Sequence, residues 1–309
     1  MFMNIGILVQ TMCVLFGTIV VGYIIQKLGI LNTESNRKIS ELIVKVTSPA
    51  LIIGSVCNKN LESGSSVFFI FFIGIGLYIY YIILAKIIIK PFSLEKSSSN
   101  IYEMMLIFTN TGFVGFPIFR VMYGDTAIFY ASILHIPFNI IMYSYGVYMI
   151  NSSKAGADSF KLKDVLNSGV ISAILALIIY TLHIPVPKVI GDTVILIGDA
   201  TIPLSMMLIG ASLADVPVKD VISSYKVYIF SVVKLIILPI ITYFVIRLIT
   251  ADEFIIGLVT VSAGLPAGTM IVMMVARYGG DTKESSVGVF LTTLFSVATI
   301  PLMVYILLA

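Results

Sequence analysis

Long apolar runs alternate with short polar stretches along the whole chain. A helix needs about 20 mostly apolar residues to cross a bilayer. Runs that meet this requirement predict ten membrane-spanning helices, at residues 5–26, 38–57, 66–89, 101–122, 126–150, 165–184, 190–213, 221–248, 254–277 and 284–308. The polar stretches are short, and the longest covers residues 151–164. We therefore expect the function to reside inside the helical bundle.

The composition supports a membrane protein. Hydrophobic residues make up 59% of the chain and charged residues 11%, whereas a soluble domain carries about 25% charged residues. A soluble protein must keep a polar surface, so these values exclude an ordinary soluble enzyme and make the lipid bilayer the expected surroundings. The net charge is only +3 and the charges are scattered, so we expect no nucleic-acid partner.

The basic residues predict the orientation in the membrane. Most of the 19 Lys and Arg residues lie in the loops that follow the first, third, fifth, seventh and ninth predicted spans. The opposite side holds only Lys59, Arg120, Lys188 and Arg247. Because cytoplasmic loops are enriched in positive charge, both termini are predicted to lie outside the cytoplasm, with the protein in the cell (inner or plasma) membrane.

The loop at 151–164 divides the ten spans into two sets of five. Since five is odd, the second set runs through the membrane with inverted topology, as in many secondary transporters. Two short matches support such a repeat: Lys45-Val-Thr-Ser-Pro49 with Asp199-Ala-Thr-Ile-Pro203, and Tyr123-Gly-Asp-Thr126 with Tyr278-Gly-Gly-Asp-Thr282. The predicted fold is an all-α polytopic membrane protein with repeats at 1–150 and 165–309.

The fourth and ninth spans contain small polar residues, Gly and Pro near their middle. The segments read Thr109-Asn-Thr-Gly-Phe-Val-Gly-Phe-Pro117 and Ser262-Ala-Gly-Leu-Pro-Ala-Gly-Thr269. Glycine weakens a helix, and proline removes a hydrogen bond and clashes with the preceding turn. Broken helices at matching places of two repeats are a sequence sign of a transporter substrate site. The alternative is a simple proline kink in each helix.

Two broken helices that cross create helix N-termini at membrane depth. Their free N–H groups and positive dipole ends favour an anion, and an Asn side chain adds both donors and an acceptor. The predicted substrate-binding residues in the two breaks are Asn110, Thr111, Gly112, Leu265, Pro266, Ala267, Gly268 and Thr269.

Three ionisable residues are candidates for coupling or gating. Lys234 lies inside the eighth span, where a charge is costly and usually paired or functional. It could neutralise a substrate carboxylate, or pair with a carboxylate such as Asp199 in one transport state only. His135 could relay protons, although a neutral, hydrogen-bonded histidine is the simpler interpretation. Lys45 is expected to pair with Glu41 one helical turn away.

Motifs for catalysis, cofactors and ATP are absent from the sequence. It contains no His-Glu-x-x-His, Gly-x-Ser-x-Gly, Cys-x-x-Cys or phosphate-binding Gly-x-x-x-x-Gly-Lys-Ser/Thr segment. With two His and two Cys residues in the chain, a zinc site is not expected. We therefore predict neither an enzyme nor a cofactor or metal site, and expect transport to use an ion gradient or an exchanged solute.

Several of these segments resemble one family. Asn110-Thr-Gly-Phe-Val-Gly-Phe-Pro117 is similar to the Asn-x-Gly-Phe-x-Gly-x-Pro motif of the auxin efflux carriers, which include the plant PIN auxin transporters and their bacterial relatives. Gly210-Ala-Ser-Leu213, Leu265-Pro266 and Thr292-Thr-Leu-Phe-Ser-Val-Ala-Thr-Ile-Pro301 also match the family. The resemblance covers nearly the whole chain, but plant members carry proline at the position of Thr109.

The resemblance implies a fold shared with bile-acid symporters and sodium–proton antiporters. A scaffold (1–64 and 165–218) would hold a transport part (65–150 and 219–309) that moves as an elevator, and a homodimer is an option. The implied substrates are organic anions such as auxin, malonate or malate. Asn139 matches a family Asn and is an implied substrate contact, with a helix–helix hydrogen bond as the alternative.

The favoured function is therefore secondary transport of a small organic anion. A sodium-coupled symporter of similar fold and a membrane sensor are the alternatives. The sequence leaves the substrate, the direction of transport and the coupling ion open.

Overall fold

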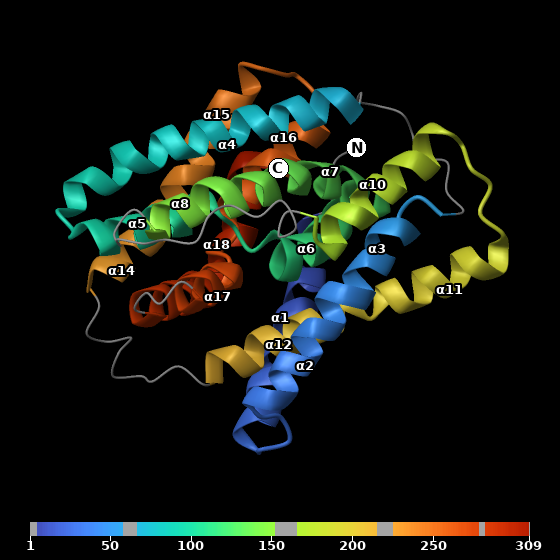
Figure 1. Cartoon of the computed structure of the whole chain (residues 1–309), viewed down its shortest axis with the longest axis horizontal. Helices are drawn as coiled ribbons and strands as arrows, with labels where there is room; N and C mark the ends of the chain where they lie inside the picture. Colours follow the sequence, from blue (N-terminus) through green and yellow to red (C-terminus); the bar gives the residue numbers. More distant parts are fainter. Residues whose placement is uncertain (1–4, 58–66, 152–165, 215–224, 278–281, 309) are drawn as a thin grey trace. The chain divides into compact units, whose positions relative to one another are not determined.

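The described residues of the computed structural model, 5–57, 67–151, 166–214, 225–277 and 282–308, are almost entirely helical (Figure 1). The elements are α1 (Ile5–Lys27), α2 (Thr33–Leu42), η1 (Ile43–Thr47), α3 (Ser48–Gly54), α4 (Val67–Ile89), η2 (Lys90–Phe92), α5 (Lys96–Ile107), η3 (Thr111–Gly115), α6 (Phe116–Tyr123), α7 (Asp125–Ile141), η4 (Met142–Gly146), α8 (Val147–Asn151), α10 (Ser168–Thr181), α11 (Lys188–Asp199), α12 (Thr201–Ala214), α14 (Tyr225–Val232), η5 (Val233–Ile237), α15 (Leu238–Arg247), α16 (Glu253–Gly264), α17 (Thr269–Arg277) and α18 (Thr282–Leu308). The predicted loop at 151–164 lies, apart from Asn151, outside the described residues.

Helices long and apolar enough to cross a membrane are present in both halves of the chain. In the described residues there are 5 of them: Val67–Phe92, Asp125–Ile150, Lys188–Ala214, Tyr225–Arg247 and Thr282–Leu308. Shorter apolar helices cover Cys13–Lys27, Ser168–Thr181 and Glu253–Gly264. The predicted all-α class is therefore confirmed for the described residues, and these helices are consistent with the predicted polytopic membrane protein. Each predicted span contains helix.

The chain divides into two compact units. The first unit comprises Met1–Phe72, Gly112–Ile136 and Lys163–Asp215, and the second comprises Ile73–Thr111, Pro137–Leu162 and Val216–Ala309. Residues 112–136 lie in the first unit, whereas the predicted transport part contains them. Segments that move together are identified by comparing two transport states of a protein. The predicted scaffold and transport parts therefore stay a prediction.

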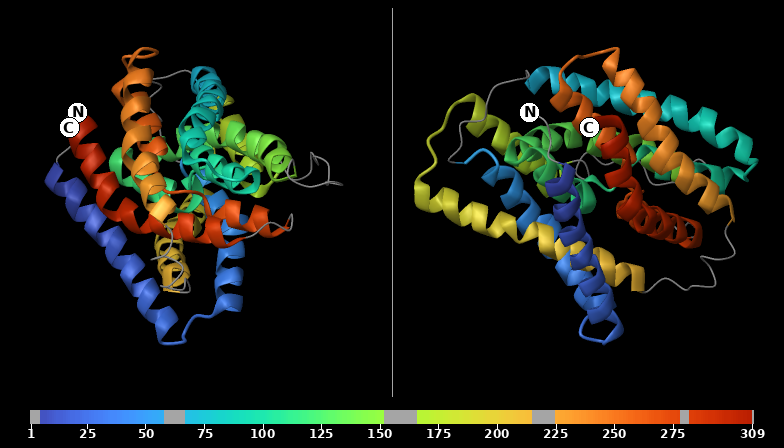
Figure 2. Two further views of the ribbon diagram at one scale, coloured as in Figure 1. Left: turned by 90° about the vertical axis from the view of Figure 1, so that its left-hand side faces the viewer. Right: turned by 180° about the vertical axis from the view of Figure 1, so that it is seen from behind.

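Close helix packing holds the first unit together. The helices α1 and α12 lie side by side, as do α3 and α11 (Figures 1 and 2). A Cβ atom on Gly22 would overlap the carbonyl oxygen of Met207, and one on Gly210 would overlap that of Ile19. Small residues let helix backbones approach closely in membrane proteins, where packing replaces the hydrophobic effect between helices.

Three of the wide π-helical turns in the described residues lie just before a proline. The segments η1, η3 and η5 end two residues before Pro49, Pro117 and Pro239. A proline lacks the N–H that would bond the carbonyl four residues earlier, and its ring presses on that carbonyl. A π-turn widens the helix at that place. These turns matter because η3 follows the first helix break and η5 carries Lys234.

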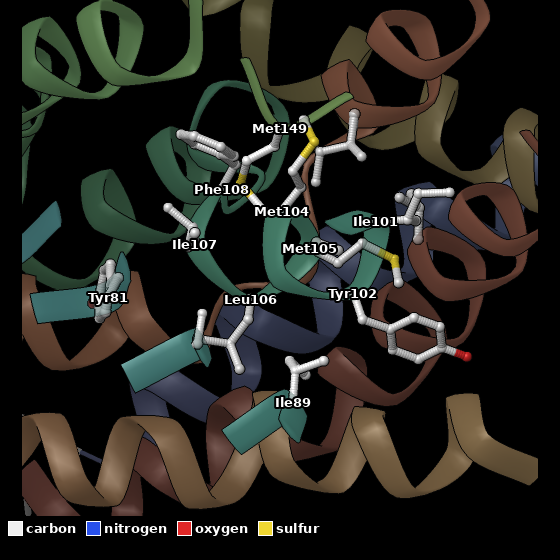
Figure 3. Close-up of a cluster of buried hydrophobic side chains, with 14 of the residues drawn as sticks. Tyr81, Ile89, Ile101, Tyr102, Met104, Met105, Leu106, Ile107, Phe108 and Met149 are labelled. Carbon is white, nitrogen blue, oxygen red and sulfur yellow. The ribbon is translucent and has the colours of Figure 1, made fainter. Parts of the chain in front are cut away.

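The core of the second unit surrounds α5. Met104, Met105, Leu106, Ile107 and Phe108 are fully buried, and Figure 3 shows their side chains among those of the surrounding helices. The last turn of α5 is therefore fixed on all sides, and the break that follows it starts from a rigid position.

We expect Gly210→Ala to lower the stability of the protein by about 1–3 kcal/mol, because the added methyl group forces α1 and α12 apart. Thermal unfolding of the purified protein measures the change. Gly17→Ala, also in α1, is the matched control, since no atom lies within 4 Å of its Cβ position. Equal unfolding temperatures of the two variants would contradict the packing argument.

Candidate functional site

The first predicted break is present and lies at the end of α5. The helix stops at Ile107, and the backbone of Phe108 is extended, with φ −102° and ψ 105°. Helical structure resumes at Thr111 in η3. Asn110 and Thr111 are both buried, with 4% and 7% of their surface exposed.

The second predicted break follows α16. This helix ends at Gly264, Leu265 is extended with φ −66° and ψ 149°, and α17 begins at Thr269. The amide of Ala267 donates to the hydroxyl oxygen of Thr292 in α18 (3.1 Å). Both helix starts agree with the positions expected from the sequence.

The two breaks pair with each other. Thr109 and Ala267 form an isolated antiparallel β-bridge. The Asn110 amide donates to the Pro266 carbonyl, and the Gly268 amide donates to the Phe108 carbonyl, both at 2.9 Å. Buried backbone groups need partners, and each break supplies those that the other lost. The predicted residues of both breaks that lie in the second unit are thus brought together.

Gly268 is required by this close approach. A Cβ atom at this position would lie 3.2 Å from the carbonyl oxygens of both Phe108 and Thr109. These oxygens belong to the bridge and cannot retreat without loss of the Gly268 hydrogen bond. The Thr109 hydroxyl lies 3.0 Å from that of Thr111.

Lys234 caps the end of α5. Its side chain is fully buried, and its ammonium group donates to the Leu106 carbonyl at 2.9 Å. In a continuous helix this carbonyl would accept from Asn110, whose amide instead bonds Pro266. A cation at a helix C-terminus also offsets the negative end of the dipole. Lys234 therefore compensates for the break.

The start of α17 offers donors to a ligand. Within the described residues, the amides of Thr269 and Met270 donate to no backbone carbonyl, and the next amide to do so is that of Ile271, which donates to Gly268. Free N–H groups at a helix N-terminus, together with the positive dipole end, attract an anion. This arrangement can hold a carboxylate.

Asn139 lies beside a residue that packs on the first break. It is buried and follows Phe138, whose ring meets the Phe108 ring edge-on at 5.6 Å. Tyr78 of α4 contacts the same Phe138 ring at 5.9 Å. The aromatic contacts thus fix this part of α7 against the break.

The remaining candidates lie in the first unit. Gly112 follows Thr111 directly, and nothing lies within 4 Å of its Cβ position. The His135 ring packs at 6.1 Å from that of Phe116. The expected local pair of Lys45 with Glu41 is confirmed, at 3.5 Å.

Asp199 has a partner that the sequence did not suggest. Arg120 of α6 contacts the Asp199 carboxylate at 2.5 Å and the Asp125 carboxylate at 2.8 Å. Asp199 was expected to be a candidate partner of Lys234, but its described partner is Arg120. The opposite charges of Arg120 and Asp199 are compatible with this ion pair. The two residues are 79 positions apart in the sequence, however, and no local sequence pattern predicts that they meet.

No group of His, Cys, Asp and Glu side chains suited to a metal ion occurs in the part of the chain that the structure describes. The donors at the breaks are backbone amides, hydroxyls and carboxamides. Such groups can form hydrogen bonds to an organic anion.

Comparison with known proteins gives two similarities. Residues 7–304 match a family described as membrane transport protein. The chain is also 27% identical over 305 residues to an uncharacterized transporter of Methanocaldococcus jannaschii, with 94% of this chain and 96% of that protein covered.

We expect Lys234→Glu to destabilise the protein by about 3–5 kcal/mol, because it places an unpaired buried acid against the Leu106 carbonyl and the negative end of α5. Lys234→Gln keeps a donor and should lie between that variant and the wild type. Thermal unfolding gives the order.

Lys226→Glu, on the preceding helix α14, is the matched control for a reversed charge. Because Lys226 lies outside the break, Lys226→Glu should change the free energy of unfolding by no more than about 0.5 kcal/mol. If Lys234→Glu unfolds at the same temperature as Lys226→Glu, Lys234 does not cap α5.

Proposed function

The chain belongs to the family of membrane transport proteins, the auxin efflux carrier family that its motifs resemble, and on this premise we propose that it is a secondary transporter of a small organic anion. The substrate is a carboxylate of the auxin, malonate or malate type. It binds where the fourth and ninth spans are broken. One observation carries the proposal: paired breaks place a helix N-terminus with free amides inside the protein.

The proposed fold has ten spans in two inverted five-helix repeats, 1–150 and 165–309. It is supported by the two helix breaks, one in each proposed repeat. The first break follows Ile107 in the first repeat, and the second follows Gly264 in the second repeat. Unwound backbone at membrane depth persists where it is packed in protein or lines a cavity, which favours a site here.

The anionic substrate class is supported by the charges and donors at the breaks. The amides of Thr269 and Met270 begin α17, while the C-terminal end of α5 is already compensated by Lys234. The donors that remain for a ligand are therefore positive in character. Asn110, Thr111 and Asn139 add side-chain groups that can orient a carboxylate.

The proposed mechanism is an elevator. A transport part (65–150 and 219–309) carries the substrate past a scaffold (1–64 and 165–218) in the cell membrane, with both termini outside the cytoplasm and a homodimer as the assembly. Repeat-based transporters alternate access largely by rigid-body motion of one part against the other. Energy comes from an ion gradient or an exchanged solute.

The pair of Arg120 and Asp199 is the proposed gate. Under this partition Arg120 moves with the transport part and Asp199 stays in the scaffold, whereas Asp125 travels with Arg120. Only the contact with Asp199 changes during transport. An ion pair that forms in one state stabilises that state alone.

A thermal-shift screen of carboxylates on the purified protein tests the function. Malonate, malate and indole-3-acetate, each with and without sodium and at two pH values, should include at least one stabilising anion. Asn110→Ala should weaken its affinity by about tenfold, because one hydrogen bond to a charged ligand is lost, and should lower flux into proteoliposomes. A requirement for sodium would favour the symporter alternative.

Asn36→Ala is the control, since the Asn36 carboxamide donates to Gln26 at 3.1 Å in the first unit and to no residue of the breaks. Its affinity and flux should match those of the wild type. If no carboxylate stabilises the protein and Asn110→Ala leaves the flux unchanged, the site is wrongly assigned.

For the gate, Asp199→Asn and Asp125→Asn form a matched pair, as each removes one carboxylate from Arg120. We expect Asp199→Asn to change the transport rate by about two- to fivefold, the effect of one partly exposed ion pair on the balance of states. Asp125→Asn should affect thermal stability with little change in rate. Flux in proteoliposomes and thermal unfolding separate the two, and equal changes in rate would exclude a gate.

A further inference from the structure

Thr292 of α18 contacts the second break directly. Its side chain is fully buried, and its hydroxyl oxygen accepts from the Ala267 amide at 3.1 Å. The same hydroxyl donates within α18, to the Gly288 carbonyl at 2.7 Å, with the Val289 carbonyl at 3.2 Å. Both hydrogen-bonding roles of the side chain are therefore in use.

This double role fixes the side chain. In a helix, a threonine hydroxyl can bond the carbonyl three or four residues earlier, as Thr292 does. The hydroxyl hydrogen then points along α18, and the oxygen lone pair faces Ala267. The result is a chain of hydrogen bonds from the break to the backbone of α18.

Ala267 is held from two directions as a consequence. On one side it pairs with Thr109 in the bridge, and on the other it donates to Thr292. Residues 267 and 268 immediately precede α17, so their orientation determines where the Thr269 and Met270 amides point. Without a partner, the buried Ala267 amide would carry a desolvation penalty of about 1–3 kcal/mol.

Two other buried hydroxyls of α18 bond within that helix. Ser296 donates to Thr293 at 2.7 Å, and Ser285 donates to Thr282 at 3.0 Å. Such bonds join a side chain to the backbone of its own helix and hold no other segment. Among these residues, Thr292 is distinguished by its link to a broken helix.

We propose that Thr292 is a positioning residue for substrate binding, which sets the direction of the α17 N-terminus through the Ala267 amide. The inference rests on the proposed anion site and adds a specificity element outside both breaks. A carboxylate bound at α17 depends on amide direction, so the loss of the Thr292 hydroxyl weakens binding even though Thr292 does not touch the ligand.

Three variants separate positioning from packing. Thr292→Val keeps the shape and removes the hydroxyl, Thr292→Ser keeps the hydroxyl and removes the methyl group, and Ser296→Ala removes a buried hydroxyl one turn along the same helix. Hydrogen–deuterium exchange of purified protein, followed in peptides that cover residues 265–271, reports the Ala267 region without any ligand.

Thr292→Val should raise exchange in this segment by about tenfold, the equivalent of one lost hydrogen bond. Thr292→Ser and Ser296→Ala should exchange like the wild type. If Thr292→Val exchanges like Ser296→Ala, or if Thr292→Ser fails to restore protection, the inference is overturned.

A second measurement uses the affinity for malonate, malate and indole-3-acetate, determined by titration. Thr292→Val should bind the stabilising probe about five- to tenfold more weakly, while Thr292→Ser and Ser296→Ala bind it normally. If the wild type binds none of the three probes, the proposed function fails and exchange still decides the role of Thr292. If the wild type and Thr292→Val bind equally, the positioning role alone fails.

Discussion

Every backbone polar group at membrane depth needs a partner inside the protein, and the rest of this structure depends on that constraint. A continuous helix satisfies it by itself, but a broken helix does not. Here two helices break in or beside segments that contain glycine and proline, and each supplies the partners that the other lacks through a short antiparallel bridge. Neither break would be tolerable alone. This interdependence keeps irregular backbone in a membrane-spanning bundle and leaves helix N-termini available to a ligand.

The bridge cannot satisfy every group, and side chains from neighbouring helices supply the rest. Lys234 reaches the Leu106 carbonyl that α5 leaves open, and Thr292 accepts from the Ala267 amide before α17. Lys234 is a charged donor at a helix C-terminus, and Thr292 is a neutral acceptor near a helix N-terminus. The donor meets a carbonyl oxygen and the acceptor meets an amide, so each side chain complements the backbone group that it contacts. The helices that contribute them thereby share control of the geometry of the site.

The sequence predicted those features that depend on local rules. Glycine and proline located the two breaks, and the apolar runs located the helices, because both effects act within a few residues. It did not predict which partners would meet. The contacts of Lys234 with Leu106 and of Arg120 with Asp199 join residues 128 and 79 positions apart, and only tertiary packing selects them. Thr292 lay inside a family motif, but its spacing did not distinguish it from Thr293.

The placement of charge favours the anionic ligand that we propose. A buried cation is costly unless it is paired, and Lys234 is paired with a carbonyl that carries only a partial negative charge. The negative end of the α5 dipole carries only about half an elementary charge. Among the described residues, the ammonium group is therefore left without a full counter-charge. A carboxylate at the α17 amides would supply the missing negative charge without contact with Lys234, so the residue that stabilises the fold would also favour the substrate.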